Sequence, residues 1–170
     1  MTTKANDRPE FEHLFSHLDA TGAARMVEVS GKSVTSRRAV AVGEIILGPA
    51  ITEAVYNQTV KKGDVLGVAR VAGIMAAKNT SAAIPLCHPL SLTGCQVNFK
   101  LDREKFRLLV ECVVTTEGQT GVEMEALCGV TGALLAVYDM CKAIDKGMII
   151  GPISLAEKSG GKSGDWKAAT

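Results

Sequence analysis

LTGCQVNFKL (residues 92–101) and FRLLVECVVTT (residues 106–116) are two neighbouring runs in which valine, leucine, phenylalanine and threonine recur. Each run has the length and composition of a β-strand. The charged tetrapeptide DREK (residues 102–105) separates them, and a short polar link between two such runs predicts a hairpin. We therefore expect an antiparallel strand pair in the middle of the chain.

Helices and strands are also expected on both sides of this hairpin. Gly48-Pro49 breaks a β-branched segment, and Asp64 is a suitable N-cap for a segment with a helical apolar stripe. Gly147 ends a second long apolar segment. The predicted elements are a strand over 34–47, a short helix over 50–60, a long helix over 65–78, a second long helix over 122–144 and a strand over 148–155.

The main elements follow the order β, α, β, β, α, β, which is the ferredoxin-like split pattern. The sequence therefore predicts an α+β fold, in which two main helices pack on one face of an antiparallel sheet. With 170 residues, 46% of them hydrophobic, we expect one domain over 25–170 that ends in a Gly-rich segment, 158–170. The polar residues 1–24 are expected to form a flexible arm.

The composition argues against several classes of protein. The formal net charge is only +1, whereas a nonspecific nucleic-acid or membrane binder has a surface dominated by charges of one sign. The longest apolar runs in the sequence, such as 133–137, fall well short of the ~20 residues of a membrane helix, as does the run 148–150. The five cysteines are odd in number, contain no Cys-x-x-Cys pair and follow no secretory leader, so we expect reduced thiols in a cytoplasm.

The segment KSGGKSG (158–164) combines two lysines with a Gly/Ser run. Glycine allows successive backbone N–H groups to face an anion, and lysine supplies a point charge, so the segment is a candidate polyphosphate grip. It is not a Walker A loop, because Ala156 stands where that loop needs its first glycine. The alternative is a flexible, solvated tail.

His88 lies between Pro85 and Pro89, which narrow the conformations of its loop and fix where the imidazole points. It is either a structural histidine or a catalytic or substrate-binding one. Cys87 beside it raises the question of a metal, but the remaining cysteines lack the spacing of a tetrahedral zinc site. We predict no metal.

Glu123 and Glu125 stand two residues apart, where a strand gives way to a helix. An extended backbone would aim both carboxylates to the same side, where they could bind a guanine-like amidine edge or act as acid and base. The alternative is that both only complement the helix dipole.

Asp139 and Lys142 lie at i and i+3 in an otherwise apolar helical segment. They form either an exposed salt bridge or a partly buried pair in which the lysine acts as a base. Glu125 and Asp139 are 14 residues apart, or ~21 Å along a helix axis, so one small substrate cannot touch both. We expect separate sites or, preferably, a site shared between two subunits.

Taken together, these segments resemble the molybdenum cofactor biosynthesis protein C family, the cyclic pyranopterin monophosphate synthases. The similarity begins near residue 25 and reaches the end of the chain, and Glu28 is a departure, since the family usually has aspartate there. The matching segments are Met26–Ser30, Arg37, Lys62–Val65, Leu86–Leu90, Thr120–Leu127, Tyr138–Ala143 and Lys158–Asp165.

The resemblance implies a cytosolic lyase that needs no redox cofactor. It would convert (8S)-3',8-cyclo-7,8-dihydroguanosine 5'-triphosphate to cyclic pyranopterin monophosphate and diphosphate. It also implies a ferredoxin-like subunit in a hexamer, a trimer of dimers with active sites at the dimer interface. Asp139 and Lys142 would transfer protons. The residues implied around the substrate are Arg37, Lys62, Leu86, Cys87, His88, Glu123, Met124, Glu125, Lys158 and Lys162.

A different class stays open, because ferredoxin-like sheets also occur in nucleotide-sensing and RNA-binding modules. Sheets of that kind stack bases on strand aromatics, and the predicted strands offer little beyond Phe99 and Phe106. We therefore expect a small nucleotide-derived substrate rather than a nucleic acid or a membrane.

Overall fold

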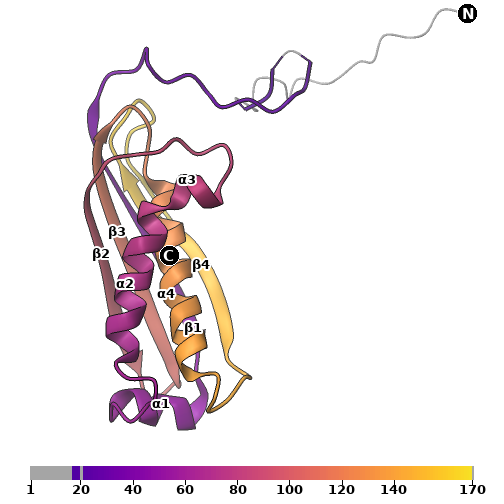
Figure 1. Ribbon diagram of the computed structural model, residues 1–170. Helices are drawn as coiled ribbons and strands as arrows, with labels where there is room; N and C mark the ends of the chain where they lie inside the picture. Colours follow the sequence, from indigo (N-terminus) through magenta and orange to yellow (C-terminus); the bar gives the residue numbers. More distant parts are fainter. Residues whose placement is uncertain (1–16, 20, 170) are drawn as a thin grey trace, which may run out of the picture.

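The computed structural model describes residues 17–19 and 21–169, which form one antiparallel five-stranded sheet with helices (Figure 1). The strands are β1 (Thr35–Ile46), β2 (Leu92–Asp102), β3 (Arg107–Gly118), β4 (Ile149–Ser159) and β5 (Trp166–Lys167). The helices are α1 (Gly48–Tyr56), α2 (Val65–Lys78), α3 (Thr80–Ala83) and α4 (Glu123–Cys141).

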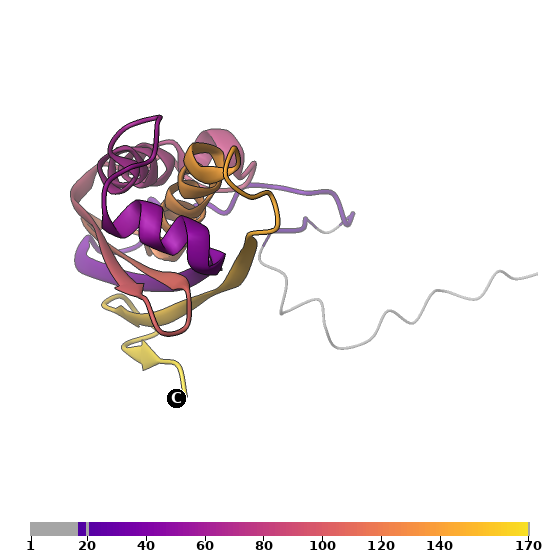
Figure 2. The same cartoon turned by 90° about the horizontal axis from the view of Figure 1, so that it is seen from below.

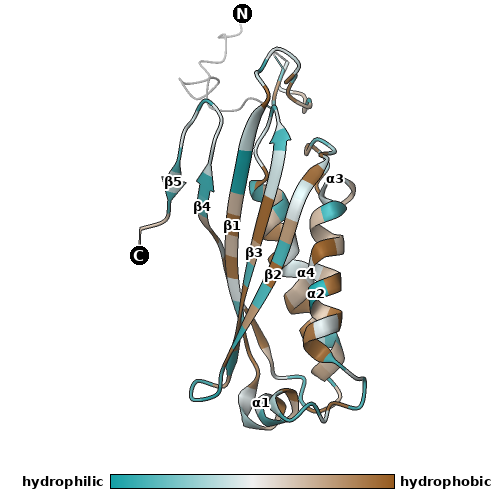
Figure 3. Ribbon diagram, turned by 90° about the vertical axis from the view of Figure 1, so that its left-hand side faces the viewer, coloured by the Kyte–Doolittle hydropathy of each residue, from teal (hydrophilic) through white to brown (hydrophobic). Residues whose placement is uncertain are grey.

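The strand order in the sheet is β2-β3-β1-β4-β5, and every neighbouring pair is antiparallel (Figure 3). The predicted hairpin is β2 and β3, paired from Leu92↔Thr116 to Asp102↔Arg107. β3 lies between β1 and β2, which is the order expected for a split βαβ unit. The prediction of an α+β fold is confirmed, and the strand order is consistent with its ferredoxin-like form.

Both long helices cover the same side of the sheet (Figure 2). They approach closely because small residues face one another: a Cβ added to Gly73 of α2 would lie only 2.8 Å from the carbonyl oxygen of Gly129 in α4. Asp64 caps α2 as predicted, since its carboxylate accepts the Gly67 N–H at 2.9 Å. The core beneath the helices consists mainly of Ala, Val, Ile and Leu side chains, as the low aromatic content suggests, together with two methionines and two cysteines.

α4 is also long and apolar enough, by length and hydropathy alone, to qualify as a membrane span. The uninterrupted apolar runs in the sequence did not indicate this, because glycine and threonine interrupt the apolar residues of α4. Nine of its residues are buried, and the helix packs on β1, β3 and β4. These contacts are those of a core helix.

Three element ends differ from the prediction by three residues or more. α1 ends at Tyr56 rather than 60, and Gln58 just beyond it has a left-handed φ of 55°, which a helix cannot contain. α4 ends at Cys141 rather than 144, because a tighter turn follows, in which the Ile144 N–H donates to the Cys141 carbonyl at 2.8 Å. β4 continues to Ser159, which pairs with Arg38 of β1. The Gly-rich segment therefore begins within a strand. The short elements α3 and β5 were not predicted, because four and two residues carry no periodic signal.

Most of the predicted arm over 1–24 lies outside the described residues, and its flexibility stays a prediction. Within the described part, Leu18 bridges to Ala24, and the Asp19 carboxylate accepts the N–H groups of Thr21 and Ala23.

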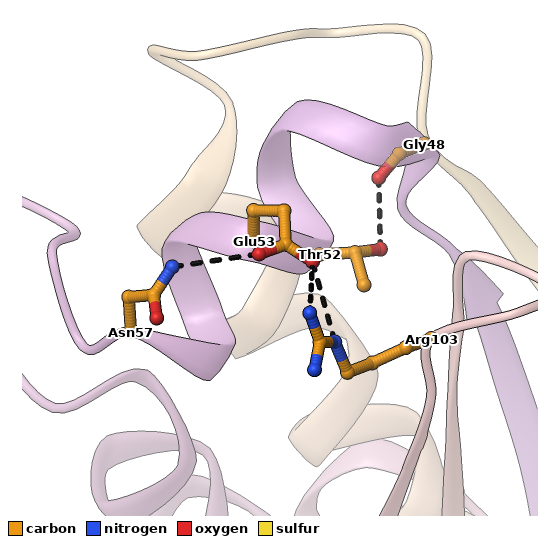
Figure 4. A network of polar contacts seen from close by, with 5 residues as sticks. All are labelled: Gly48, Thr52, Glu53, Asn57 and Arg103. Carbon is orange, nitrogen blue, oxygen red and sulfur yellow. Dashed lines mark hydrogen bonds and ion pairs between the residues drawn. The ribbon is translucent and has the colours of Figure 1, made fainter.

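α1 is fastened to the β2–β3 hairpin by one arginine (Figure 4). The Arg103 guanidinium donates to Glu53 at 2.7 Å and lies over the Tyr56 ring, 3.9 Å from its centroid. The turn that carries Lys62 follows α1 directly, so this contact joins the hairpin to the base of that turn.

Candidate functional site

A hollow of about 290 Å³ lies at the N-terminal end of α4. Three segments enclose it: Val27, Val29 and Lys32 before β1, the loop Leu86–Leu90 after α3, and the junction Thr120–Glu125 between β3 and α4. Leu86, Cys87 and His88 all line it, as predicted from the proline-flanked loop. His17 also lines it, although no motif pointed to this residue.

The imidazole of His88 is fixed from one side. Its Nε2 lies 2.8 Å from the carbonyl oxygen of Val27 and must carry the proton, because a carbonyl only accepts. Nδ1 is then the nitrogen left for a ligand. Burial raises the pKa of the neighbouring Cys87 thiol, and the charge of Glu125 raises it further, so this thiol is a poor nucleophile.

Glu123 and Glu125 both line the hollow, but from a helix rather than from an extended segment. Both lie in the first turn of α4, where residues two apart diverge, so the prediction of an extended pair was wrong. Glu125 faces inward and is only 4% exposed. Burial raises its pKa, and the nearby Glu123 charge adds to the effect. Met124, 36% exposed, lies between them and also lines the hollow.

Cationic groups gather beside Glu123. The Lys158 ammonium lies 3.7 Å from a Glu123 carboxylate oxygen and donates to the Ser163 hydroxyl. Arg37 donates through Nε to the Gly118 carbonyl at 2.8 Å, and its guanidinium fills the space that a side chain on Gly161 would need. The predicted grip therefore packs on β1.

The segment after Lys158 has the backbone that the grip requires. Gly160 and Gly161 both have left-handed φ values, 89° and 75°. The Gly160 N–H donates to the Asp165 carboxylate at 3.3 Å, and Lys162 is exposed. Whether this segment binds phosphate stays a prediction.

Lys62, Asp139 and Lys142 form a separate cluster. The Lys62 ammonium donates to Oδ2 of Asp139 at 2.8 Å and to its backbone carbonyl, while Lys142 binds Oδ1 at 2.7 Å. Their side chains are between 43% and 57% exposed, so the prediction of a partly buried pair is wrong for a single chain. Hydrogen bonds from Lys142 and then Lys62 lower the pKa of Asp139 to about 2, and Asp139 raises the pKa of Lys142.

The two clusters occupy opposite ends of α4. Glu125 and Asp139 are 14 residues apart in one continuous helix, which corresponds to ~21 Å. Within one chain, the structure brings together His88, Glu123, Glu125, Lys158 and Arg37, but not Lys62, Asp139 or Lys142.

Besides His17, sequence reasoning missed two residues of the site. Lys32 lines the hollow, and Gln119 donates from one amide nitrogen to the carbonyl oxygens of Ser30 and Lys32. Lys32 lies two residues after the Met26–Ser30 motif and Gln119 directly before the Thr120–Leu127 motif, and neither has a local pattern that indicates chemistry.

Among the described residues, no three His, Cys, Asp or Glu side chains gather as a metal cluster would require. That the site uses no metal stays a prediction.

Comparison with known proteins agrees with the motifs in this site. The profile of the MoaC family matches residues 26–161. Proteins called cyclic pyranopterin monophosphate synthase from Pelotomaculum thermopropionicum and Thermoanaerobacter sp. (strain X514) are 60% and 56% identical to the chain over 149 residues, 88% of its length, and the matches cover 88% and 94% of those proteins. One from Bacillus cereus (strain B4264) is 53% identical over 154 residues, covering 89% of the chain and 96% of the relative.

Proposed function

Since the chain belongs to the MoaC family, as its sequence motifs predicted, we propose that it is a cyclic pyranopterin monophosphate synthase of molybdenum cofactor biosynthesis. It acts as a lyase on (8S)-3',8-cyclo-7,8-dihydroguanosine 5'-triphosphate and releases diphosphate. The reaction takes place in the cytoplasm and needs no redox cofactor.

The observation that carries the proposal is a polar hollow with a cationic border. The hollow has the scale of a ring system rather than of a whole nucleoside triphosphate. Lys158 lies beside its Glu123 wall, and Arg37 binds the Gly118 carbonyl just before the Thr120–Glu125 wall begins, so a triphosphate that extends from the hollow would meet positive charge there. The ring of the substrate would therefore lie in the hollow, and its phosphates would lie beside it, next to the cationic side chains.

Glu125 suits the recognition of an amino-pyrimidinone edge. Burial favours its neutral form, and a neutral carboxyl donates one hydrogen bond while accepting another. That pattern complements a ring edge with both donors and acceptors. Leu86, Cys87 and Met124 shape the apolar sides, and Nδ1 of His88 supplies a further polar contact.

Lys142, Asp139 and Lys62 move the protons that ring rearrangement requires. Because its pKa is raised, Lys142 holds its proton in the resting protein and serves first as a general acid. To act as a base afterwards, it must lose water, since desolvation favours the neutral amine.

A second copy of the chain supplies that desolvation. We place the Lys62–Asp139–Lys142 cluster of one subunit against the hollow of another, within a hexamer built as a trimer of dimers. The support is the ~21 Å separation along α4 and the exposure of all three side chains in a single chain.

Charge on the departing diphosphate grows as the cyclic phosphate closes. In the proposed dimer, Lys158 and Arg37 of one copy and Lys62 of the other stabilise this charge, and Lys162 joins from the Gly-rich segment.

The test is incubation with the cyclised triphosphate, followed by measurement of diphosphate and of the pterin product. Stoichiometric release of both supports the proposal. Tight binding without release would instead favour a nucleotide sensor, and binding of single-stranded RNA would favour the RNA-binding alternative. The structure offers that last class little, because Phe99 packs against the core under Arg70 rather than on an open sheet face.

A further inference from the structure

One wall of the hollow is a segment outside the sheet. Residues 27–32 belong to no helix or strand, and Val27 and Val29 face the hollow while Glu28 and Ser30 are exposed. This alternation gives the segment an apolar inner side and a polar outer side. It will be called the wall segment.

Two hydrogen bonds shape the wall segment from within. The Glu28 carboxylate accepts the Ser30 N–H at 2.9 Å, and the Lys32 N–H donates to the Val29 carbonyl at 2.9 Å. Both contacts join residues of the segment to each other. They fold it into a turn but do not attach it to the protein.

Side chains from elsewhere attach its two ends. At the first end, His88 binds the Val27 carbonyl. At the second, Nε2 of Gln119 donates to the carbonyl oxygens of Ser30 at 3.0 Å and of Lys32 at 2.9 Å. One amide nitrogen therefore uses both of its hydrogens on this end of the wall segment.

Gln119 is well placed to hold the wall segment at a fixed distance from the carboxyl groups of the hollow. It lies between the end of β3 at Gly118 and the start of α4 at Glu123, and it is half-buried. Its backbone is thus a few residues from Glu123 and Glu125, so fixing the wall segment to Gln119 fixes it relative to those carboxyl groups.

We propose that Gln119 is a positioning residue that holds the wall segment closed over the hollow and thereby sets the affinity for the ring of the substrate. The effect on turnover rests on the proposed function, whereas the effect on the wall segment does not. Gln119 itself touches no reacting atom.

The chemistry of the contact predicts the order of effects among three substitutions. Lysine is of similar length and still donates to both carbonyls, so Gln119→Lys should retain closure. Gln119→Met keeps the bulk but loses both donors. Gln119→Glu places an acceptor against two acceptors, so it should open the wall segment most.

Opening reduces the binding-competent fraction and raises the apparent KM by the same factor. We expect a KM close to that of the parent for Gln119→Lys, about five- to tenfold higher for Gln119→Met, and higher again for Gln119→Glu, with kcat within about twofold throughout. Asn98→Ala is the matched control, because it removes a single exposed amide contact, to Glu111, on the far strand β2.

Hydrogen exchange of residues 27–32 gives a second readout that needs no substrate. Deuterium uptake should rise in the same order, with thermal unfolding of each variant measured to confirm that it is folded. Equal uptake and equal KM in the parent, Gln119→Met and Gln119→Glu would overturn the proposal, as would a fall in kcat at constant KM. If the parent releases no diphosphate, the proposed function fails, and the order of uptake still decides the role of Gln119.

Discussion

The two ends of α4 differ in how much of their chemistry one chain completes. At the N-terminal end, three segments wall a hollow, and Glu125 is almost entirely removed from water. At the C-terminal end, Lys62, Asp139 and Lys142 bind each other in the open, with about half of each side chain exposed. One chain thus forms a complete binding hollow at the N-terminal end of α4. At the C-terminal end it presents charged side chains that no pocket of the described residues encloses.

Opposite physical causes shift the carboxyl groups at these ends. Desolvation raises the pKa of Glu125, whereas hydrogen bonds from two ammonium groups lower the pKa of Asp139 to about 2. Burial therefore favours the neutral form of Glu125, whereas the two ammonium groups favour the ionised form of Asp139. At the N-terminal end, the buried carboxyl group of Glu125 is suited to recognition of a ring edge. At the C-terminal end, ionised Asp139 between two lysines is suited to proton transfer.

The largest effect should come from the exposed end. Lys142→Ala removes the proposed proton donor, and we expect kcat to fall by about 10² to 10⁴-fold. The melting temperature should hardly change, since the side chain is about half exposed and makes a surface ion pair. Steady-state diphosphate release and thermal unfolding measure the two quantities.

Lys146→Ala is the matched control for Lys142. Lys146 also follows α4, and its structural contact is its backbone carbonyl, which accepts from the Tyr138 hydroxyl and survives the substitution. Its activity should equal that of the parent. If the Lys142→Ala protein kept full turnover, the proton transfer would not take place at this end of α4.

Mixing variants of the two ends tests whether they meet across subunits. Lys142→Ala and Glu125→Ala should each be inactive, but a mixed dimer would contain one site with both native residues. Random exchange of subunits should then restore about a quarter of the parent activity. If the mixture stays as inactive as its components under conditions where subunit exchange is demonstrated, each end works within its own chain.

The sequence predicted the regular parts of the fold because each has a strong local signal. α2 begins and ends where its stripe and its Asp64 cap indicate, and the β2–β3 hairpin turns at the charged tetrapeptide. β4 was predicted too short, because the residues before Ser159 are polar and only their pairing with Arg38 and Ala39 makes them a strand. Such pairing depends on the tertiary fold.

The site was harder to predict for a related reason. His88, Glu125 and Lys158 were recognised by motif, yet their roles depend on burial that no local pattern encodes. Gln119 acts through a hydrogen bond to carbonyls nearly ninety residues away, which sequence spacing cannot indicate. The apolar neighbours of Asp139 suggested a partly buried pair as one alternative, but Val137 and Met140 are buried in the core while Asp139 and Lys142 remain outside it.

Glu125→Gln should raise the stability of the protein at high pH while it weakens substrate binding. In Glu125, burial raises the folded-state pKa above the unfolded value near 4.5, so the folded state binds more protons, and stability falls as pH rises through that window. Glutamine removes the titration. We expect the variant to melt a few degrees higher than the parent at pH 8 but not at pH 4, while losing affinity for the substrate.

The pH dependence is the decisive part of that experiment. Glu123→Gln is the control, because Glu123 is about one-third exposed and lies near the Lys158 ammonium. It should show no comparable gain at pH 8. A gain for Glu125→Gln that is equal at both pH values would mean that shape rather than desolvation causes it.

The smallest effect should come from Arg103→Ala, which tests whether exposed ion pairs at the C-terminal end of α4 are all functional. Arg103 binds Glu53 of α1 (Figure 4) and lies over the Tyr56 ring, at the same end of the protein as the Lys62 turn, and its contacts within the described part of the chain include no residue of the proposed chemistry. Because the contact is largely exposed, we expect the melting temperature to fall by a few degrees at most and kcat to stay unchanged. Arg103→Lys keeps the charge without the planar stacking and should lie between. A large loss of kcat at constant stability would mean that α1 positions Lys62, and the exposed end would then depend on the hairpin as well as on a second subunit.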